Sequence, residues 1–268
     1  MIRQFIAMAV GLVVLALASS AAAQDPFPHE VRTTKFTIVD VDESTAFYEN
    51  LIGLDEVDRF VAEGTLVEPF MGFDDPTRRI GLLRYAEPET VPKSPIPVSV
   101  LTVPDLDAVL ARFTEADEPF QEFSGEATGG IRIAFVTDPS GNGIELVEAE
   151  GPARVAGARL IVDDRAAVEE FFVRVFEVEP GNRIQTDTFD EVFFDFDGGM
   201  FVALFEPKDQ APLPKSEHPV VAIYTTQYDI LRERVEAGGL GMQEFGDAIL
   251  LAKDPSGNVV EIVRRPSN

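Results

Sequence analysis

Two stretches of the chain are identical, Asp138–Asn142 and Asp254–Asn258, both reading DPSGN and lying 116 residues apart. Proline presets φ at the first turn position, glycine permits positive φ, and Asp and Asn side chains bond to neighbouring backbone. The residues that follow also match, IELV over 144–147 and VEIV over 260–263. The motif therefore predicts the same tight turn between two strands, twice. It has too few glycines and no following helix for a phosphate-binding loop.

A second internal match lies upstream of the first. Residues 47–51 (FYENL) resemble residues 171–175 (FFVRV), at a spacing of 124. Two matches at nearly equal spacing indicate a duplicated unit. We expect one domain over residues 30–149 and a second over 155–265, joined by the linker Ala149–Ala156.

Each half divides again at a proline-rich connector, residues 86–95 and 206–217. The four modules each begin with a β-rich run, and these runs are Lys35–Val39, Val98–Val103, Ala158–Val162 and Val220–Thr225. Amphipathic helices follow, with apolar residues at i, i+3, i+4 and i+7, as in Leu106, Val109, Leu110 and Phe113. Asp164 is placed to cap one helix and Gly53 to end another. Hairpin strands complete each module, so the sequence predicts an α+β fold of four β-α-β-β-β modules.

The N-terminus resembles a secretory leader. Arg3 supplies a positive charge, Phe5–Ala18 is almost wholly apolar, and Ala21–Ala23 offers a small-residue cleavage site. We expect a signal peptide over residues 1–23 and an exported, periplasmic or secreted protein with no membrane attachment after cleavage. The alternative is an uncleaved anchor, because about 19 apolar residues can nearly span a bilayer.

Composition excludes several classes of function. The formal charge of −25 over 268 residues argues against nucleic acid and anionic membranes as partners. Without cysteine, the chain has no disulfide, thiolate ligand or cysteine nucleophile. His29 and His218 are its two histidines, so one chain cannot supply three histidine ligands.

Together, the paired modules, the Phe-Tyr helix and the DPSGN turn followed by Glu and apolar residues resemble the vicinal oxygen chelate superfamily. That superfamily includes glyoxalase I, bleomycin-resistance proteins, fosfomycin-resistance enzymes and extradiol dioxygenases. The resemblance implies two domains with curled mixed sheets, each enclosing a concave pocket. In enzymatic members, His and Glu on the first and last strands hold a divalent metal such as Fe, Mn, Ni or Zn.

Carried onto this sequence, the resemblance leaves an incomplete ligand set. Glu145 and Glu261 match the last-strand ligand of each half. The first-strand positions carry poor ligands, namely Thr33, Val98, Gly157 and Val220. Residues 80–83 supply no carboxylate either. Since one carboxylate does not hold a transition metal firmly, a metal site requires a shifted alignment.

Either histidine could enter the site through such a shift. His218 lies two residues before Val220 and would join Glu261, while His29 lies four residues before Thr33. The alternative for His218 is a connector residue near the start of a strand.

The two glutamates lie in apolar alternating strands, where an ionised carboxylate needs a partner. They are candidates for ligand binding or general-base work, or they are bonded to backbone or to an arginine such as Arg84, Arg132 or Arg159. The 21 phenylalanines form core, and some could line a pocket for a planar ligand.

Three functions remain open at this point. The first is an exported, metal-free or degenerate-site binder of a small hydrophobic or aromatic molecule. The second is a divergent metal-dependent lyase, isomerase or dioxygenase that uses Glu145, Glu261 or His218. The third is an interaction scaffold, so whether the protein is an enzyme is open too.

Overall fold

The structure is a computed structural model that describes residues 28–87, 93–125, 128–196, 199–208, 212–213 and 215–266. The predicted leader, residues 1–23, lies outside these residues. Across the described ranges, no helix has the length and apolar character needed to cross a membrane.

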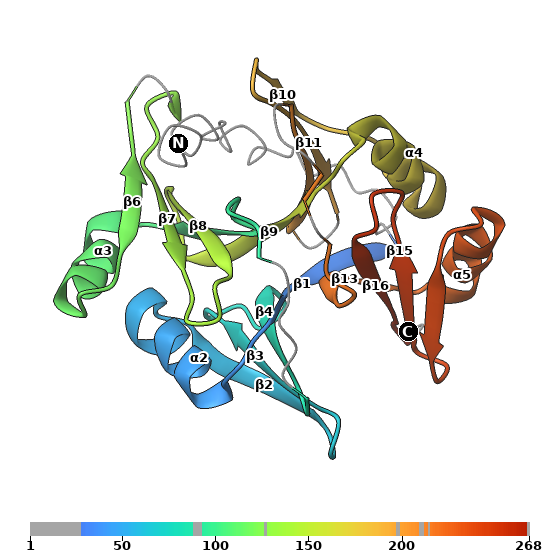
Figure 1. The fold of residues 1–268 in the computed structure, drawn as a ribbon, viewed down its shortest axis with the longest axis horizontal. Coiled ribbons are helices and arrows are strands. Elements are labelled where there is room, and N and C mark those ends of the chain that lie inside the picture. The colour runs from blue at the N-terminus through green and yellow to red at the C-terminus, as the bar shows by residue number, and fades with distance from the viewer. Residues whose placement is uncertain are drawn as a thin grey trace. The chain divides into compact units, whose positions relative to one another are not determined.

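The chain separates into two compact units. Unit 1 comprises Thr34–Ala156, and unit 2 comprises Gly157–Asn268 with the described residues up to Thr33. The order β-α-β-β-β occurs four times, which confirms the predicted α+β fold (Figure 1). We number these repeats modules 1 to 4 in chain order.

Modules 1 and 2 occupy the first half of the chain. Module 1 contains β1 (His29–Thr37), α2 (Val41–Phe47), the π-helical turn η2 (Tyr48–Ile52), β2 (Asp55–Ala62), β3 (Leu66–Gly72) and β4 (Arg79–Tyr85). Module 2 contains β5 (Ser99–Val103), α3 (Leu106–Glu115), β6 (Phe120–Phe123), β7 (Ile133–Thr137) and β8 (Gly143–Glu148).

Modules 3 and 4 repeat this plan. Module 3 contains β9 (Arg154–Ile161), α4 (Arg165–Phe176), β10 (Arg183–Gln185), β11 (Phe189–Asp195) and β12 (Phe201–Pro207). Module 4 contains β13 (Pro219–Thr225), α5 (Tyr228–Ala237), β14 (Met242–Phe245), β15 (Ile249–Lys253) and β16 (Val259–Arg264).

The strands form two mixed sheets, with orders β14-β15-β16-β13-β1-β4-β3-β2 and β10-β11-β12-β9-β5-β8-β7-β6. In modules 2, 3 and 4 the first strand pairs in parallel with the last, and the hairpin strands pair antiparallel. A parallel first-to-last pair requires a crossover, and the helix of each module supplies it.

Asp164 caps α4 as the sequence predicts, and Asp40 and Asp105 cap α2 and α3 in the same way. Asp40, Asp105 and Asp164 each accept a hydrogen bond from a backbone N–H in the first turn of the helix that follows. At the end of η2, Gly53 has φ of 91°, a left-handed conformation that favours glycine.

Helix α4 packs on one face of the module 3 strands and so defines their two faces. The ring of Phe172 stacks on that of Phe194, with centroids 5.3 Å apart. Because side chains alternate along a strand, Phe193 and Glu191 point to the other side. We call this side, which is turned away from α4, the inner face; it includes Gly157, Arg159, Glu191, Phe193, Phe201, Ala203 and Phe205.

Candidate functional site

A buried ion pair lies at the centre of the inner face of unit 2. Arg159 on β9 is in register with Ala203 on β12, and Ala203 is in register with Phe193 on β11. Nε of Arg159 donates to Oε1 of Glu191 at 2.7 Å, and the two side chains are 3% and 1% exposed. Charged groups removed from water to this degree require a partner of opposite charge.

Unit 1 has the same device at the same place in the repeat. Nζ of Lys35 on β1 lies 2.9 Å from Oε1 of Glu68 on β3, and both side chains are 5% exposed. Lys35 precedes Arg159 by 124 residues, the spacing of the helix repeat. Lys35 was not among the candidates from the sequence, although the spacing of 124 aligns it with Arg159.

Phenylalanine rings surround the ion pair in unit 2. The rings of Phe189 and Phe205 stack at 4.8 Å, and those of Phe193 and Phe201 meet edge to face at 5.3 Å. The Arg159 guanidinium lies 5.7 Å from the centre of the Phe205 ring. We call these four buried rings, of which Phe201 is the most exposed at 9%, the aromatic wall.

Glu145 and Glu261 lie on the last strands, β8 and β16. Glu145 is 2% exposed and lies in register with Val100 and Phe135. Glu261 is 7% exposed and lies in register with Ala222 and Leu251. Both carboxylates are buried on their strands, and the residues beside them on neighbouring strands are apolar.

The residues at the implied metal positions do not fit a metal ion. The first-strand residues in register with the two glutamates are Val100 and Ala222, two positions beyond Val98 and Val220. At Gly157, a Cβ atom would lie 2.5 Å from ring carbons of Phe201, so no ligating side chain fits there. Thr33 is fully buried on β1. Among the described residues, no group of three or more His, Asp or Glu side chains could hold a metal.

His218 immediately precedes β13, and its backbone N–H donates to the Ser216 hydroxyl at 3.0 Å. His218 therefore lies in the connector just before β13. The pairing of β13 with β16 shifts register between Pro219 and Val221, so counting residues in twos does not carry His218 onto the face of Glu261.

His29 is buried at the start of β1. Its Nδ1 lies 2.8 Å from the Thr225 hydroxyl, and its ring meets Phe176 edge to face at 6.0 Å. Burial, helped by the positive charge of Arg234, lowers its pKa to about 4. The imidazole is therefore neutral at pH 7 and fits a structural position.

The two DPSGN turns join the modules of each unit. The Asp138 carboxylate accepts from the backbone and side-chain amides of Asn142, and the Asn142 side chain donates to the Thr37 carbonyl at 3.2 Å. In unit 2 the Asn258 side chain donates to the Ile161 carbonyl at 3.1 Å. The predicted turns are confirmed, and each also fastens the end of the preceding module's first strand.

The turn of unit 1 carries an additional contact. The Tyr48 hydroxyl donates to Asp138 at 3.1 Å, whereas Phe172 occupies the matching place in unit 2. Burial and then the Asp138 carboxylate raise the pKa of Tyr48 well above its usual value, so the phenol stays protonated. Burial also raises the pKa of Asp138 and of Asp254.

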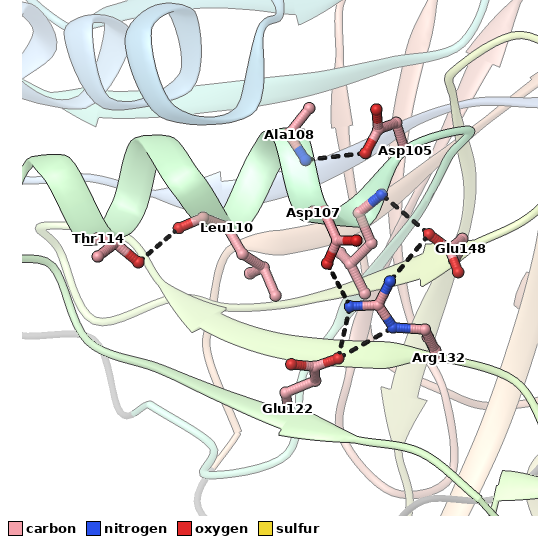
Figure 2. A network of polar contacts seen from close by, with 9 residues as sticks. Asp105, Asp107, Ala108, Leu110, Thr114, Glu122, Arg132 and Glu148 are labelled. Carbon is pink, nitrogen blue, oxygen red and sulfur yellow. Dashed lines mark hydrogen bonds and ion pairs between the residues drawn. The ribbon is translucent and has the colours of Figure 1, made fainter.

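Two of the arginines considered from the sequence serve other contacts. Figure 2 shows the Arg132 guanidinium held by Glu122, Asp107 and Glu148, beside the α3 N-terminus capped by Asp105. Arg84 donates to the Val39 carbonyl at 2.5 Å. Arg159 is the one of the three that forms a buried pair on the inner face.

Comparison with known proteins agrees with this architecture. The profile of the Glyoxalase/Bleomycin resistance protein/Dioxygenase superfamily matches residues 31–146. Glyoxalase I from Zea mays is similar to the chain, with a TM-score of 0.75 at 17% identity, over 88% of this chain and 92% of that one. A candidate dioxygenase from Bacillus subtilis reaches 0.68 at 16% identity, over 91% and 87%.

No curated protein sequence matches the chain. At such low sequence identity, the solved structures show that the fold is shared and nothing more. The profile match, in contrast, rests on the sequence of residues 31–146. The profile match over residues 31–146 supports the resemblance drawn from the DPSGN turns and the module order, and the solved structures share the fold over most of the chain.

Proposed function

We propose that the protein binds a small planar, apolar molecule on the aromatic wall of unit 2 and does so without a metal ion. The proposal rests on one observation, the gathering of four phenylalanine rings on the inner face of a single module. Large aromatic side chains beside a few polar groups are typical of small-molecule sites.

The two units differ at the matching positions. Phe193 corresponds to Phe70, but Phe189 and Phe205 correspond to Leu66 and Leu83. Phe201 corresponds to Arg79, whose guanidinium lies 3.8 Å from the centre of the Phe70 ring. Unit 2 therefore supplies the wall that suits a planar ligand, and unit 1 does not.

The test uses N-phenyl-1-naphthylamine, a neutral aromatic probe that fluoresces in apolar surroundings, with chelator present throughout. The chain contains no tryptophan, so protein emission does not interfere. We expect saturable binding that Phe193→Ala weakens about tenfold, since an aromatic contact contributes about 0.5–1.5 kcal/mol beyond its buried area.

Phe70→Ala is the matched control, because it removes the corresponding ring from unit 1. It should leave the affinity unchanged, and circular dichroism should show that both variants fold. Equal losses in the two variants, or no saturable binding by the wild type, would contradict the proposal.

Export would place this binding activity outside the cytoplasm, where sequestering a harmful aromatic compound is a plausible task. The export itself rests on the leader-like sequence of residues 1–23. Release of a chain shortened at residue 23 into the periplasm or medium is the measurement that checks it.

The second candidate is a metal-dependent lyase, isomerase or dioxygenase. Its supporting observation is the burial of Glu145 and Glu261 at the last-strand ligand positions. It requires stoichiometric metal that is lost in Glu145→Gln or Glu261→Gln. The apolar residues in register with both glutamates make it the less favoured candidate.

A further inference from the structure

We propose that Lys35 and Arg159 take the place of the metal ion in this chain. Lys35 lies on the first strand of module 1 and Arg159 on the first strand of module 3. Each is a fixed cation that is held by a buried carboxylate on the third strand of the same module. In this proposal, which goes beyond ligand binding, basic side chains of the protein supply the positive charge that a metal ion would otherwise supply.

Arg159 lies close to the position on β9 at which the family implies a metal ligand. Arg159 lies two residues after Gly157, the position at which the family implies a ligand, and therefore on the same face of β9. The Phe201 ring covers Gly157 and leaves no room for a ligating side chain. The nearest charged group on that strand face is thus a cation rather than a metal ligand.

The two basic side chains balance the charge of two buried carboxylates. A buried carboxylate needs a compensating positive charge, which a metal ion or a basic side chain can supply. Glu191 receives it from Arg159 at 2.7 Å, and Glu68 receives it from Lys35 at 2.9 Å. A guanidinium or ammonium at this place repels a divalent cation and engages one carboxylate oxygen of each glutamate.

The buried ion pair occurs in both units. Buried ion pairs contribute little to stability on balance and are often replaceable by apolar residues. Both units nevertheless have one, with a basic residue on the first strand and a glutamate on the third. Because this energetically costly pair occurs in both units, we infer that each unit requires a fixed cation at this position of the first strand.

Metal binding by the wild-type protein is the direct test. The protein is equilibrated with Mn²⁺, Ni²⁺ or Zn²⁺, desalted and analysed by elemental mass spectrometry, and its melting temperature is compared with that in chelator. We expect no stoichiometric metal and no shift. One bound equivalent that disappears in Glu191→Gln, Glu145→Gln or Glu261→Gln would overturn the proposal.

Removing the fixed cation should make the protein responsive to metal. Arg159→Ala should lower the melting temperature, and a divalent cation should raise it again because the variant removes the guanidinium that lies beside the Glu191 carboxylate. Arg159→Ala/Glu191→Gln should lose this response. A response no greater than that of the wild type would also overturn the proposal.

Should Arg159→Ala fail to fold, Arg159→Met/Glu191→Gln provides a neutral pair of similar volume. It should fold and bind no metal, whereas stoichiometric metal in this variant would count against the proposal. These readouts are independent of the aromatic probe, so failure of the proposed function and failure of this inference are distinguishable.

Discussion

The two units place a buried ion pair at the same point of the repeat but surround it differently. Around Arg159 and Glu191 the inner face carries four phenylalanine rings, whereas the positions around Lys35 and Glu68 carry Phe70, two leucines and an arginine. The buried ion pair is therefore common to both units, whereas the group of four phenylalanine rings is found in unit 2. Changes made at matching positions separate these two roles.

The largest effect should come from breaking an ion pair. Arg159→Met leaves the Glu191 carboxylate buried without its cation, which costs about 3–5 kcal/mol of unfolding free energy in comparable cases. Lys35→Met should cost a similar amount in unit 1. Urea denaturation measures both, and a loss below about 1 kcal/mol in only one of the two variants would show that the pairs are not equivalent.

Acid should destabilise unit 2 through His29. The folded pKa of about 4 lies below the unfolded value of 6.5, so the unfolded chain binds the proton more readily between these values. Stability is therefore lost as pH falls from 6.5 to 4, by about 3 kcal/mol in total. His29→Gln should remove this loss.

His218→Gln is the control for that experiment, because it removes the other histidine at a connector. Urea denaturation at pH 7 and pH 4 provides the comparison. If His29→Gln and His218→Gln show the same acid dependence as the wild type, the buried imidazole is not responsible.

The turn asparagines offer a third comparison. Asn258→Ala removes the bonds to Asp254 and to the Ile161 carbonyl, with an expected loss of about 1–3 kcal/mol. Asn142→Ala should cost more, because the Asn142 Oδ1 also accepts a hydrogen bond from Lys93 Nζ at 2.6 Å. Thermal unfolding of the two variants checks the order, and equal losses would show that the contact with Lys93 contributes nothing.

The smallest effect should come from Tyr48→Phe, which makes the turn of unit 1 like that of unit 2. Loss of the hydrogen bond to Asp138 should lower stability by about 1 kcal/mol, with the ring packing retained. Differential scanning calorimetry provides the measurement. An unchanged melting temperature in Tyr48→Phe would show that the phenol contributes only packing.

The sequence by itself determined the architecture of this protein. The repeated DPSGN turn, the helical spacing of apolar residues and the β-rich runs are local signals, and local signals suffice for turns, helices and strands. The module order, the caps at Asp164 and Gly53 and the resemblance to the superfamily all followed from them. The sequence also placed Glu145 and Glu261 on apolar strands, where the structure has them.

Only the tertiary structure decided what lies beside those strands. The pairing of Arg159 with Glu191 and of Lys35 with Glu68 joins residues about 30 positions apart, and strand register sets it. The register also shows that Val100 and Ala222, rather than Val98 and Val220, lie beside the two glutamates. Because the register shifts between Pro219 and Val221, the alternation of side chains does not place His218 on the face of Glu261. Because one residue of slippage turns every side chain to the other face, sequence spacing cannot specify these contacts, and hydrogen bonding between strands does.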